Sequence, residues 1–263
     1  MHTWNPNQYL KFESERTRPC QDLANRVLVE HPRRIIDLGC GPGNSTAVVI
    51  RRWPEAEITG LDSSSDMIAA ARQALPQVKW ITEGIEKWAA STEKSDRYDV
   101  VFSNAAFQWI ADHARTFPQI FNHVAPGGAL AAQMPASQSD PVHRFMREMA
   151  RSAAWQASFP NGVKEWRTES AAYYYDVLSP LAAQLDIWET NYLQVMPSLE
   201  SIVEFFKGTA LRPYLGLLHT ETERARFLAE YLENLRPLYP PRSDGSVLFP
   251  FNRIFVVAYR SAG

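Results

Sequence analysis

The stretch that most constrains the fold of this 263-residue chain is IIDLGCGPGNST, residues 35–46. A short apolar run ends in an acid, three glycines follow within five residues, and then comes an Asn-Ser-Thr sequence typical of a helix start. Glycine has no Cβ, so a loop of this kind lets a ligand approach the main chain closely. The stretch therefore predicts a strand, a ligand-binding loop and a helix in succession.

Strand-like and helix-like segments alternate through the first half of the chain. The expected strands are residues 34–38, 57–61, 78–82, 98–103 and 128–133, and the expected helices are 45–52, 67–75 and 114–124. Strands that alternate with helices across Gly, Pro and Asn turns predict βαβ units on a parallel sheet. Ligands of such sheets bind at the carboxyl ends of the strands.

The second half is predicted to add two strands and two mostly helical insertions. Residues 185–195 and 254–259 have strand patterns, whereas 142–155, 199–207 and 220–235 have helical ones. We therefore expect one α/β domain over residues 1–263 with a seven-stranded, mostly parallel, Rossmann-like sheet. Its core would comprise residues 30–135, 180–196 and 250–260, and insertions at about 136–180 and 197–247 would cover a substrate.

Composition excludes several classes of protein. The formal net charge of −2 creates no global field that would attract nucleic acid or an anionic membrane. No apolar run reaches the ~18 residues of a membrane span, and the first residues lack a signal-peptide pattern. Cys20 and Cys40 form neither a disulfide framework nor a metal-ligand spacing. We expect a cytoplasmic protein without a bound metal.

The basic residues are unequally divided. Six of the 27 are Lys, which leaves 21 Arg. The planar guanidinium group suits anionic ligands such as carboxylates and phosphates. A GC-rich coding sequence would produce the same bias, so this feature alone does not identify a ligand.

Three kinds of glycine-rich loop can be compared with residues 37–43. A P-loop requires a Lys that is absent here. The dinucleotide motif G-x-G-x-x-G is one residue longer than the spacing of Gly39, Gly41 and Gly43, and Pro42 removes one N–H donor. This spacing argues against an NAD dehydrogenase. DLGCGPG resembles, residue for residue, the D-x-G-x-G-x-G loop of class I S-adenosylmethionine-dependent methyltransferases.

That resemblance implies S-adenosylmethionine as the cofactor and assigns residues to its site. Asp62 follows Asp37 by 25 residues and ends the second strand, where a carboxylate would accept the ribose hydroxyls. NAD enzymes carry an acid at a similar position, so Asp62 supports the assignment only together with the loop. The implied cofactor residues are Asp37, Gly39, Gly41, Asp62, Ser63, Met67, Glu83, Gly84, Ile85 and Asn104. A glycine turn with a capping Asp and no ligand is the structural alternative.

The adenine contact departs from the family pattern. Many class I methyltransferases place an Asp near the adenine amine, and Gly84 occupies the corresponding position here. The contact would then pass to Glu83 or to the backbone around Ile85. Asn104 follows the fourth strand, where the family makes backbone contacts with the methionine part of the cofactor.

The lack of an evident catalytic base indicates the chemistry of the methyl acceptor. Methyl transfer is an in-line displacement, so the enzyme chiefly aligns the reacting atoms, and a base is needed only if the nucleophile carries a proton. The fourth strand is followed by NAAFQW, and no His/Asp or Cys/His pair near it is evident from the sequence as a catalytic base. His113 is expected at the surface. A nucleophile that is already anionic, such as a carboxylate, fits this lack of a base, so we predict positioning residues and no catalytic acid or base.

Segments across the whole chain resemble bacterial trans-aconitate 2-methyltransferases. They include WNP (4–6), DLGCGPGNST (37–46), ITGLDSS (58–64), NAAFQW (104–109), QMP (133–135), AYYYDVLS (172–179) and TALRPYL (209–215). The resemblance implies methyl transfer to one carboxylate of trans-aconitate, which gives a monomethyl ester. Tyr9 and Arg16 would then cover cofactor and substrate. The implied substrate residues are Trp4, Tyr9, Gln108, Trp109, Tyr173, Tyr174, Tyr175, Arg212 and Arg253.

Alternatives stay open at this point. Judged by residue chemistry alone, the three tyrosines could form a surface patch and Arg253 could be a strand-edge charge. Another carboxylate, such as a malonyl-carrier ester, would call for a basic docking patch, and the insertions contain no Lys/Arg cluster. A regulator that binds the cofactor without turnover is a third possibility. The expected partner is a small tricarboxylate, with the chain a monomer or a weak homo-oligomer.

Overall fold

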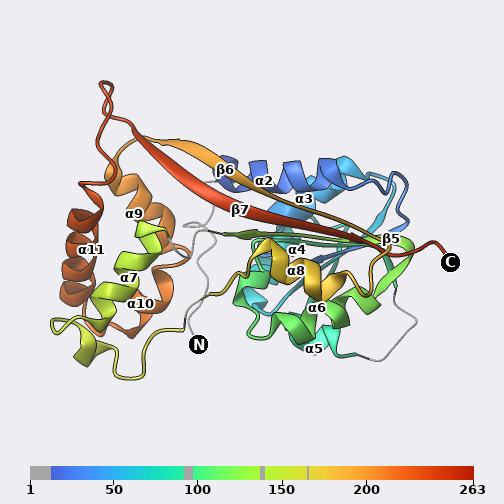
Figure 1. Ribbon diagram of the computed structural model, residues 1–263, viewed down its shortest axis with the longest axis horizontal. Helices are drawn as coiled ribbons and strands as arrows, with labels where there is room; N and C mark the ends of the chain where they lie inside the picture. Colours follow the sequence, from blue (N-terminus) through green and yellow to red (C-terminus); the bar gives the residue numbers. More distant parts are fainter. Residues whose placement is uncertain (1–12, 92–96, 137–139, 165) are drawn as a thin grey trace. The chain divides into compact units, whose positions relative to one another are not determined.

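The computed structural model describes residues 13–91, 97–136, 140–164 and 166–263 (Figure 1). Within these ranges the chain divides into two compact units. We call residues 13–136, 167–190 and 253–263 the sheet unit. Residues 137–166 and 191–252 form the helical unit.

A seven-stranded sheet has the order β3-β2-β1-β4-β5-β7-β6. The neighbours from β3 to β5 are parallel, and β7 is antiparallel to β5. This confirms the predicted α/β class with a seven-stranded, mostly parallel sheet. The strands are β1 (Arg34–Leu38), β2 (Glu57–Asp62), β3 (Lys79–Thr82), β4 (Tyr98–Asn104), β5 (Val124–Pro135), β6 (Gln184–Met196) and β7 (Val247–Tyr259).

Two strands are longer than their sequence patterns indicated. β5 begins at Val124 and β7 at Val247, whereas we expected starts at Gly128 and Ile254. The added part of β7 alternates buried and half-buried residues and contains Pro250, so its polar and turn-forming residues obscure the apolar pattern. Tertiary pairing, rather than local pattern, therefore sets these ends.

Helices cover both faces of the sheet (Figure 1). One face carries α2 (Glu13–Arg26) and α3 (Asn44–Arg52), and the other carries α5 (Ile85–Ala89), α6 (His113–Asn122) and α8 (Ala171–Leu178). α4 (Ser65–Ala74) packs against β2 and β3. Successive residues of a strand point to opposite faces. Leu130, Ala132 and Met134 of β5 consequently face α6 and α8, and Gln133 faces the side of α2.

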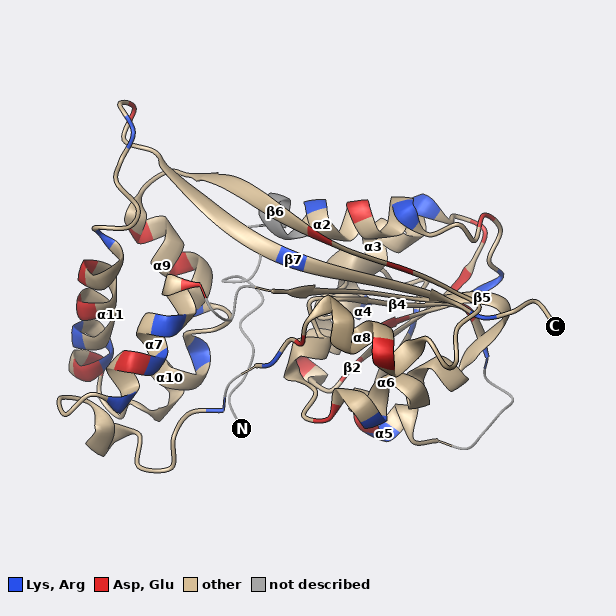
Figure 2. Cartoon of the chain, viewed as in Figure 1, with Lys and Arg blue, Asp and Glu red and all other residues tan. Residues whose placement is uncertain are grey.

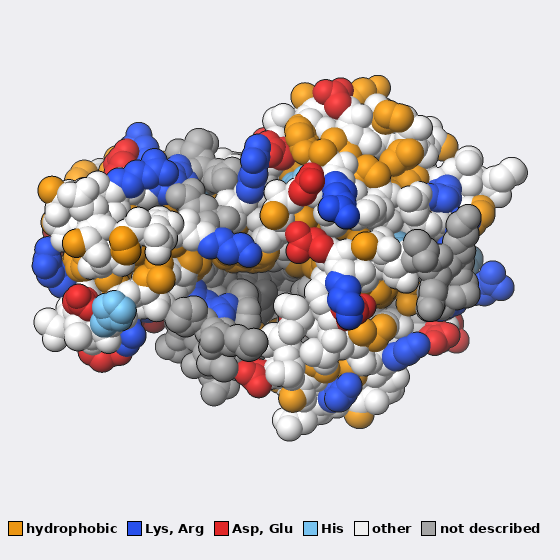
Figure 3. Space-filling model, turned by 90° about the horizontal axis from the view of Figure 1, so that it is seen from below, with side chains coloured by type: hydrophobic (Ala, Val, Ile, Leu, Met, Phe, Trp, Pro, Cys, Tyr) orange, Lys and Arg blue, Asp and Glu red, His pale blue; other side chains and the backbone are white. Residues whose placement is uncertain are grey.

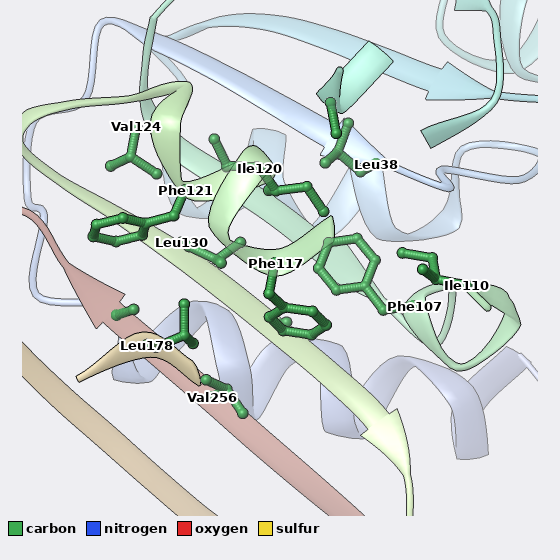
Figure 4. Packing of buried hydrophobic residues seen from close by; sticks show 14 of the residues in the cluster. Leu38, Phe107, Ile110, Phe117, Ile120, Phe121, Val124, Leu130, Leu178 and Val256 are labelled. Carbon is green, nitrogen blue, oxygen red and sulfur yellow. The ribbon is translucent and has the colours of Figure 1, made fainter. Parts of the chain in front are cut away.

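The core under α6 and α8 is built from large apolar side chains (Figure 4). Phe107 and Phe117 are fully buried and meet edge to face with ring centroids 5.2 Å apart. Leu178 of α8 and Val256 of β7 complete the same cluster. Full burial of one such side chain contributes roughly 1.5–3 kcal/mol to folding. This packing fixes the loop after β4, to which Phe107 belongs.

Residues 167–180 group with the sheet unit rather than with the first helical segment. We had expected them in the insertion because the apolar rhythm of the sheet stops after residue 135. The reason for their placement is that Tyr174 and Leu178 of α8 are buried in the core against α6.

The helical unit contains α7 (Pro141–Arg151), α9 (Leu199–Lys207), α10 (Arg212–Leu217) and α11 (Glu221–Leu235). The Tyr231 hydroxyl donates to the carbonyl of Val142 at 2.9 Å, which ties α11 to α7. Thr220 and Glu223 form a reciprocal capping box at the start of α11. Among the described helices, none combines the length and apolarity needed to cross a membrane.

Candidate functional site

Three glycines give the loop after β1 a left-handed backbone. Gly39, Gly41 and Gly43 have φ angles of 73°, 54° and 99°, a region that L-residues with a side chain rarely adopt. A Cβ added at Gly39 would lie 2.2 Å from the Cβ of Ala106, whereas one added at Gly41 would meet no atom of the described residues within 4 Å. Protein packing therefore requires glycine at 39, and open space borders the loop at 41.

Asp62 at the end of β2 holds this loop from the side. Its Oδ2 accepts a hydrogen bond from the N–H of Gly41 at 3.0 Å, and its Oδ1 accepts one from the N–H of Ser64 at 2.8 Å. Burial raises the pKa of the Asp62 carboxyl, and these two backbone bonds oppose the rise. The carboxylate is thus fixed beside the open space at Gly41, where it can accept further hydroxyl donors.

Asp37 occupies a different environment although it belongs to the same motif. The side chain is fully buried, and its Oδ2 accepts hydrogen bonds from the hydroxyls of Ser45 and Thr46, both at 2.7 Å. Burial raises the pKa of this carboxyl to about 6. Asp37 thus ties β1 to the first turn of α3, and its predicted contact with the cofactor stays a prediction.

The loop after β4 is strained and firmly held. Ala105 has a φ of 55°, which costs a residue with a Cβ about 1–2 kcal/mol. The N–H of Ala105 donates to the carbonyl of Gln133 at 2.8 Å, and its carbonyl accepts from Nε2 of Gln108 at 2.6 Å. Backbone strain of this kind persists only where surrounding contacts over-determine it, and it is frequent at ligand sites.

His113 is buried, so our expectation of a surface position was wrong. Its Nε2 lies 2.9 Å from the carbonyl of Phe107, and its Nδ1 lies 2.9 Å from the hydroxyl of Tyr174. A carbonyl can only accept, so Nε2 carries the proton and Nδ1 accepts from Tyr174. Burial lowers the pKa of His113, which favours this neutral form. The spacing of His113 with Phe117 and Ile120 would have revealed its position on the buried face of α6.

The three consecutive tyrosines of α8 have three different environments. Tyr174 is fully buried, and its hydroxyl bridges Nδ1 of His113 and the N–H of Glu169, the latter at 3.1 Å. Its hydroxyl therefore hydrogen-bonds to protein groups, and the predicted contact of Tyr174 with substrate stays a prediction. Tyr173 is half-buried and Tyr175 is 56% exposed. Their predicted contact with substrate stays a prediction.

Replacing Tyr174 with Phe is expected to lower the free energy of unfolding by about 1–3 kcal/mol, because the buried Nδ1 of His113 and the partly buried N–H of Glu169 would lose their partner. Denaturant unfolding measures the change. Tyr175→Phe is the matched control, since this neighbour on the same helix is exposed. Equal loss of stability in the two variants would contradict the bridging role of the Tyr174 hydroxyl.

The remaining residues predicted for the cofactor site are spread over three elements. Ser63 is exposed and Met67 is buried in α4. Glu83 forms an ion pair with Lys87 at 2.7 Å, and Gly84 precedes α5 with open space around it. Ile85 is half-buried. The Oδ1 atom of Asn104 is buried without a hydrogen-bond partner.

Two further groups of predicted site residues are residues 4–16 and the turn after β4. Trp4 and Tyr9 lie outside the described residues, and Arg16 lies in α2 with a side chain that is also outside them. Gln108 is buried and Trp109 half-buried in the short 3-10 turn Phe107–Trp109. The carbonyl of Gln108 accepts from the N–H of Arg167 at 2.8 Å, which holds this turn in place.

The two arginines belong to different units. Arg253 opens the sheet-unit part of β7 opposite Pro135, is 4% exposed, and is the basic segment of β7 in Figure 2. Arg212 begins α10 in the helical unit, and burial lowers the pKa of its guanidinium group. Their predicted contacts with substrate stay predictions.

Gln133 of β5 was not among the predicted residues, yet it is registered with the predicted residue Asn104 of β4. It is 1% exposed, and neither polar atom of its side-chain amide has a hydrogen-bond partner among the residues that the structure describes. The available signal was a glutamine within the otherwise apolar run ALAAQM.

Comparison with known proteins relates this chain to methyltransferases. Residues 35–128 match the family described as "Methyltransferase domain". The chain is similar to the YcgJ protein of Bacillus subtilis, with a TM-score of 0.61 at 14% identity over 94% of this chain and 100% of that one. At this identity the structural likeness shows the fold alone.

Two relatives are much more similar in sequence. Both are named trans-aconitate 2-methyltransferase. The protein from Azoarcus sp. (strain BH72) is 47% identical over 260 residues, which cover 99% of this chain and 100% of the relative. The protein from Yersinia pestis (strain Pestoides F) is 42% identical over 98% of this chain and 99% of the relative. Identity at this level over the full length shows that the chain belongs to the trans-aconitate 2-methyltransferase family.

Proposed function

We propose that this enzyme transfers the methyl group of S-adenosylmethionine to one carboxylate of trans-aconitate and releases a monomethyl ester. The observation that carries the proposal is 47% identity, over the full length of both chains, to a protein named trans-aconitate 2-methyltransferase. The geometry of the sheet unit supports it at the loops after β1, β2 and β4.

The residues of this chain fit the cofactor. Open space at the left-handed Gly41 admits a ligand against bare main chain, and the fixed carboxylate of Asp62 suits a pair of ribose hydroxyls. When bound, S-adenosylmethionine supplies an electrophilic methyl group on a sulfonium. The backbone around Asn104 and Ala105 would contact its methionine part.

The environment of His113 supports a nucleophile that needs no base. His113 is the histidine nearest to the loop after β4 in sequence. Its Nε2 is hydrogen-bonded to the carbonyl of Phe107 and its Nδ1 to the hydroxyl of Tyr174. A carboxylate is anionic at neutral pH and requires no proton removal. The site then needs only to align the acid. The turn of Gln108 and Trp109, which is held by hydrogen bonds to Ala105 and Arg167, is suited to this.

Replacing Arg253 with Ala is expected to raise the KM for trans-aconitate about 10- to 150-fold, because a charge-assisted hydrogen bond contributes ~1.5–3 kcal/mol. Arg212→Ala is expected to act in the same direction. Steady-state kinetics with trans-aconitate as the varied substrate measure both effects. Arg236→Ala is the control, since Arg236 lies exposed directly after α11 and pairs with Glu233. An unchanged KM would remove either arginine from the substrate site.

Radiolabelled methyl transfer tests the function directly. Incubation with trans-aconitate should yield labelled monomethyl ester, identified by mass, in step with consumption of S-adenosylmethionine. Transfer only to a malonyl-carrier ester would refute the substrate. Cofactor that binds but is not consumed would show a regulator instead of an enzyme.

The remaining properties follow the same proposal. We infer a small-molecule substrate, no nucleic-acid or membrane partner, a cytoplasmic location, and a monomer or weak homo-oligomer. The net charge of −2 supports the absence of a polyanionic partner. In Figure 3, basic and acidic side chains are interspersed on the face that is shown.

A further inference from the structure

Within the described part of the chain, the buried side-chain amide of Gln133 forms no hydrogen bond. It is 1% exposed, and both its Oε1 and its Nε2 lack a partner. Buried polar groups of folded proteins are nearly always hydrogen-bonded, and an orphan group calls for a specific explanation. For Gln133 both halves of the amide are orphaned, so one slightly misplaced contact does not account for it.

The neighbours of Gln133 place it at the carboxyl ends of the central strands. Asn104, the last residue of β4, is its registered partner, and Phe255 of β7 lies opposite on the other side. Side chains in register share one face of a sheet. The Oδ1 of Asn104, on this same face, is also buried without a partner. The orphaned amide of Gln133 and the orphaned Oδ1 of Asn104 thus stand side by side where ligands of parallel sheets bind.

The two strands nearest this amide, β5 and β7, favour an anion, and the acid that shares the face on β1, Asp37, accepts hydrogen bonds from Ser45 and Thr46. Arg253 is registered with Pro135, two residues beyond Gln133, so it shares the face of Gln133. β5 and β7 contain no acid. The acid of β4, Asp99, lies near the opposite end of that strand and accepts hydrogen bonds from the N–H groups of Arg33 and Arg34. A carboxylate brought to Gln133 would therefore meet an amide donor and a guanidinium group.

We propose that Gln133 is a substrate-binding residue whose side-chain amide donates a hydrogen bond to a carboxylate of the acid substrate. This inference rests on the proposed function and adds to it a residue that selects the acid. The backbone of Gln133 already positions the site, because its carbonyl accepts from the strained Ala105. The side chain would then hydrogen-bond, from the end of β5, to the acid that the loop after β4 must align.

Gln133→Met tests the proposal, because methionine has a similar length and no hydrogen-bonding amide. We expect the KM for trans-aconitate to rise about tenfold or more, as for a lost hydrogen bond to a charged group. The Kd for S-adenosylhomocysteine, measured by calorimetry, should change less than about twofold. The melting temperature of the ligand-free protein should stay equal or rise, because an orphaned buried amide is replaced by an apolar group. A purely structural role would lower it.

A second variant tests the charge of the ligand, and a control variant tests the substitution itself. Gln133→Glu places a like charge against the carboxylate and should raise KM further than Gln133→Met. Gln184→Met, at the exposed start of β6, controls for the substitution itself and should leave both constants unchanged. An unchanged KM in Gln133→Met, or a loss of S-adenosylhomocysteine affinity equal to the rise in KM, would overturn the role. A wild-type enzyme that fails to methylate trans-aconitate would refute both this role and the proposed function, whereas an active wild type confines a failure to Gln133.

Discussion

Replacing Asp62 with Ala is expected to weaken the binding of S-adenosylhomocysteine about 10- to 150-fold. This range corresponds to the ~1.5–3 kcal/mol that hydrogen bonds to a charged group contribute. The structure fixes both oxygens of Asp62 through the N–H groups of Gly41 and Ser64, so the carboxylate is ordered in advance of the ribose. Little ordering cost then offsets the gain from binding. Isothermal titration calorimetry measures the change.

Asp66→Ala is the matched control for this experiment. Asp66 is an exposed acid in the first turn of α4, four residues from Asp62. Its removal should leave the affinity within about twofold, which is the scale of surface electrostatic effects. Wild-type affinity in Asp62→Ala would show that this carboxylate does not contact the cofactor.

Gly39→Ala is expected to lower the free energy of unfolding by about 2–5 kcal/mol. The left-handed φ of 73° costs a residue with a Cβ about 1–2 kcal/mol. The new methyl group would also lie 2.2 Å from the Cβ of Ala106, and overpacking of this kind costs about 1–3 kcal/mol. Urea unfolding of the ligand-free protein measures the loss.

Gly41→Ala should lower stability less than Gly39→Ala and should also weaken the binding of S-adenosylhomocysteine. Its φ of 54° carries a similar strain, but its Cβ would meet no atom of the described residues within 4 Å. Stability should fall by only about 1–2 kcal/mol, while the affinity for S-adenosylhomocysteine falls because the methyl group enters the ligand's space. Undiminished affinity in Gly41→Ala would show that the open space at this loop belongs to no cofactor.

Much of the sheet could be predicted because its signals are local. β1 ended where expected, at Leu38, since an apolar run followed by glycine marks a buried strand and its turn within a few residues. The start of β7 could not be found this way, because pairing sets it and Pro250 interrupts the pattern. The methyltransferase loop could be distinguished from the dinucleotide loop because the two differ by one residue in glycine spacing, which is itself a local property.

The candidate site was only partly predictable. His113 and Tyr174 are 61 residues apart, and their hydrogen bond depends on how α6 and α8 pack on the sheet. From the sequence alone, His113 was expected at the surface and Tyr174 in contact with substrate. Gln133 carried no motif at all, and its orphaned amide became visible only when each buried polar atom could be matched with a partner.

By itself, the sequence determined the α/β class, the glycine loop that bares the main chain, and the family. Those properties depend on residue spacing and backbone rules that act over short stretches. The tertiary structure decided which polar groups the protein uses internally, such as Asp37 and Tyr174, and which face open space or lack partners, such as Gly41 and Gln133. The physical reason is that hydrogen bonding and burial are settled between elements distant in sequence, where spacing along the chain carries no information.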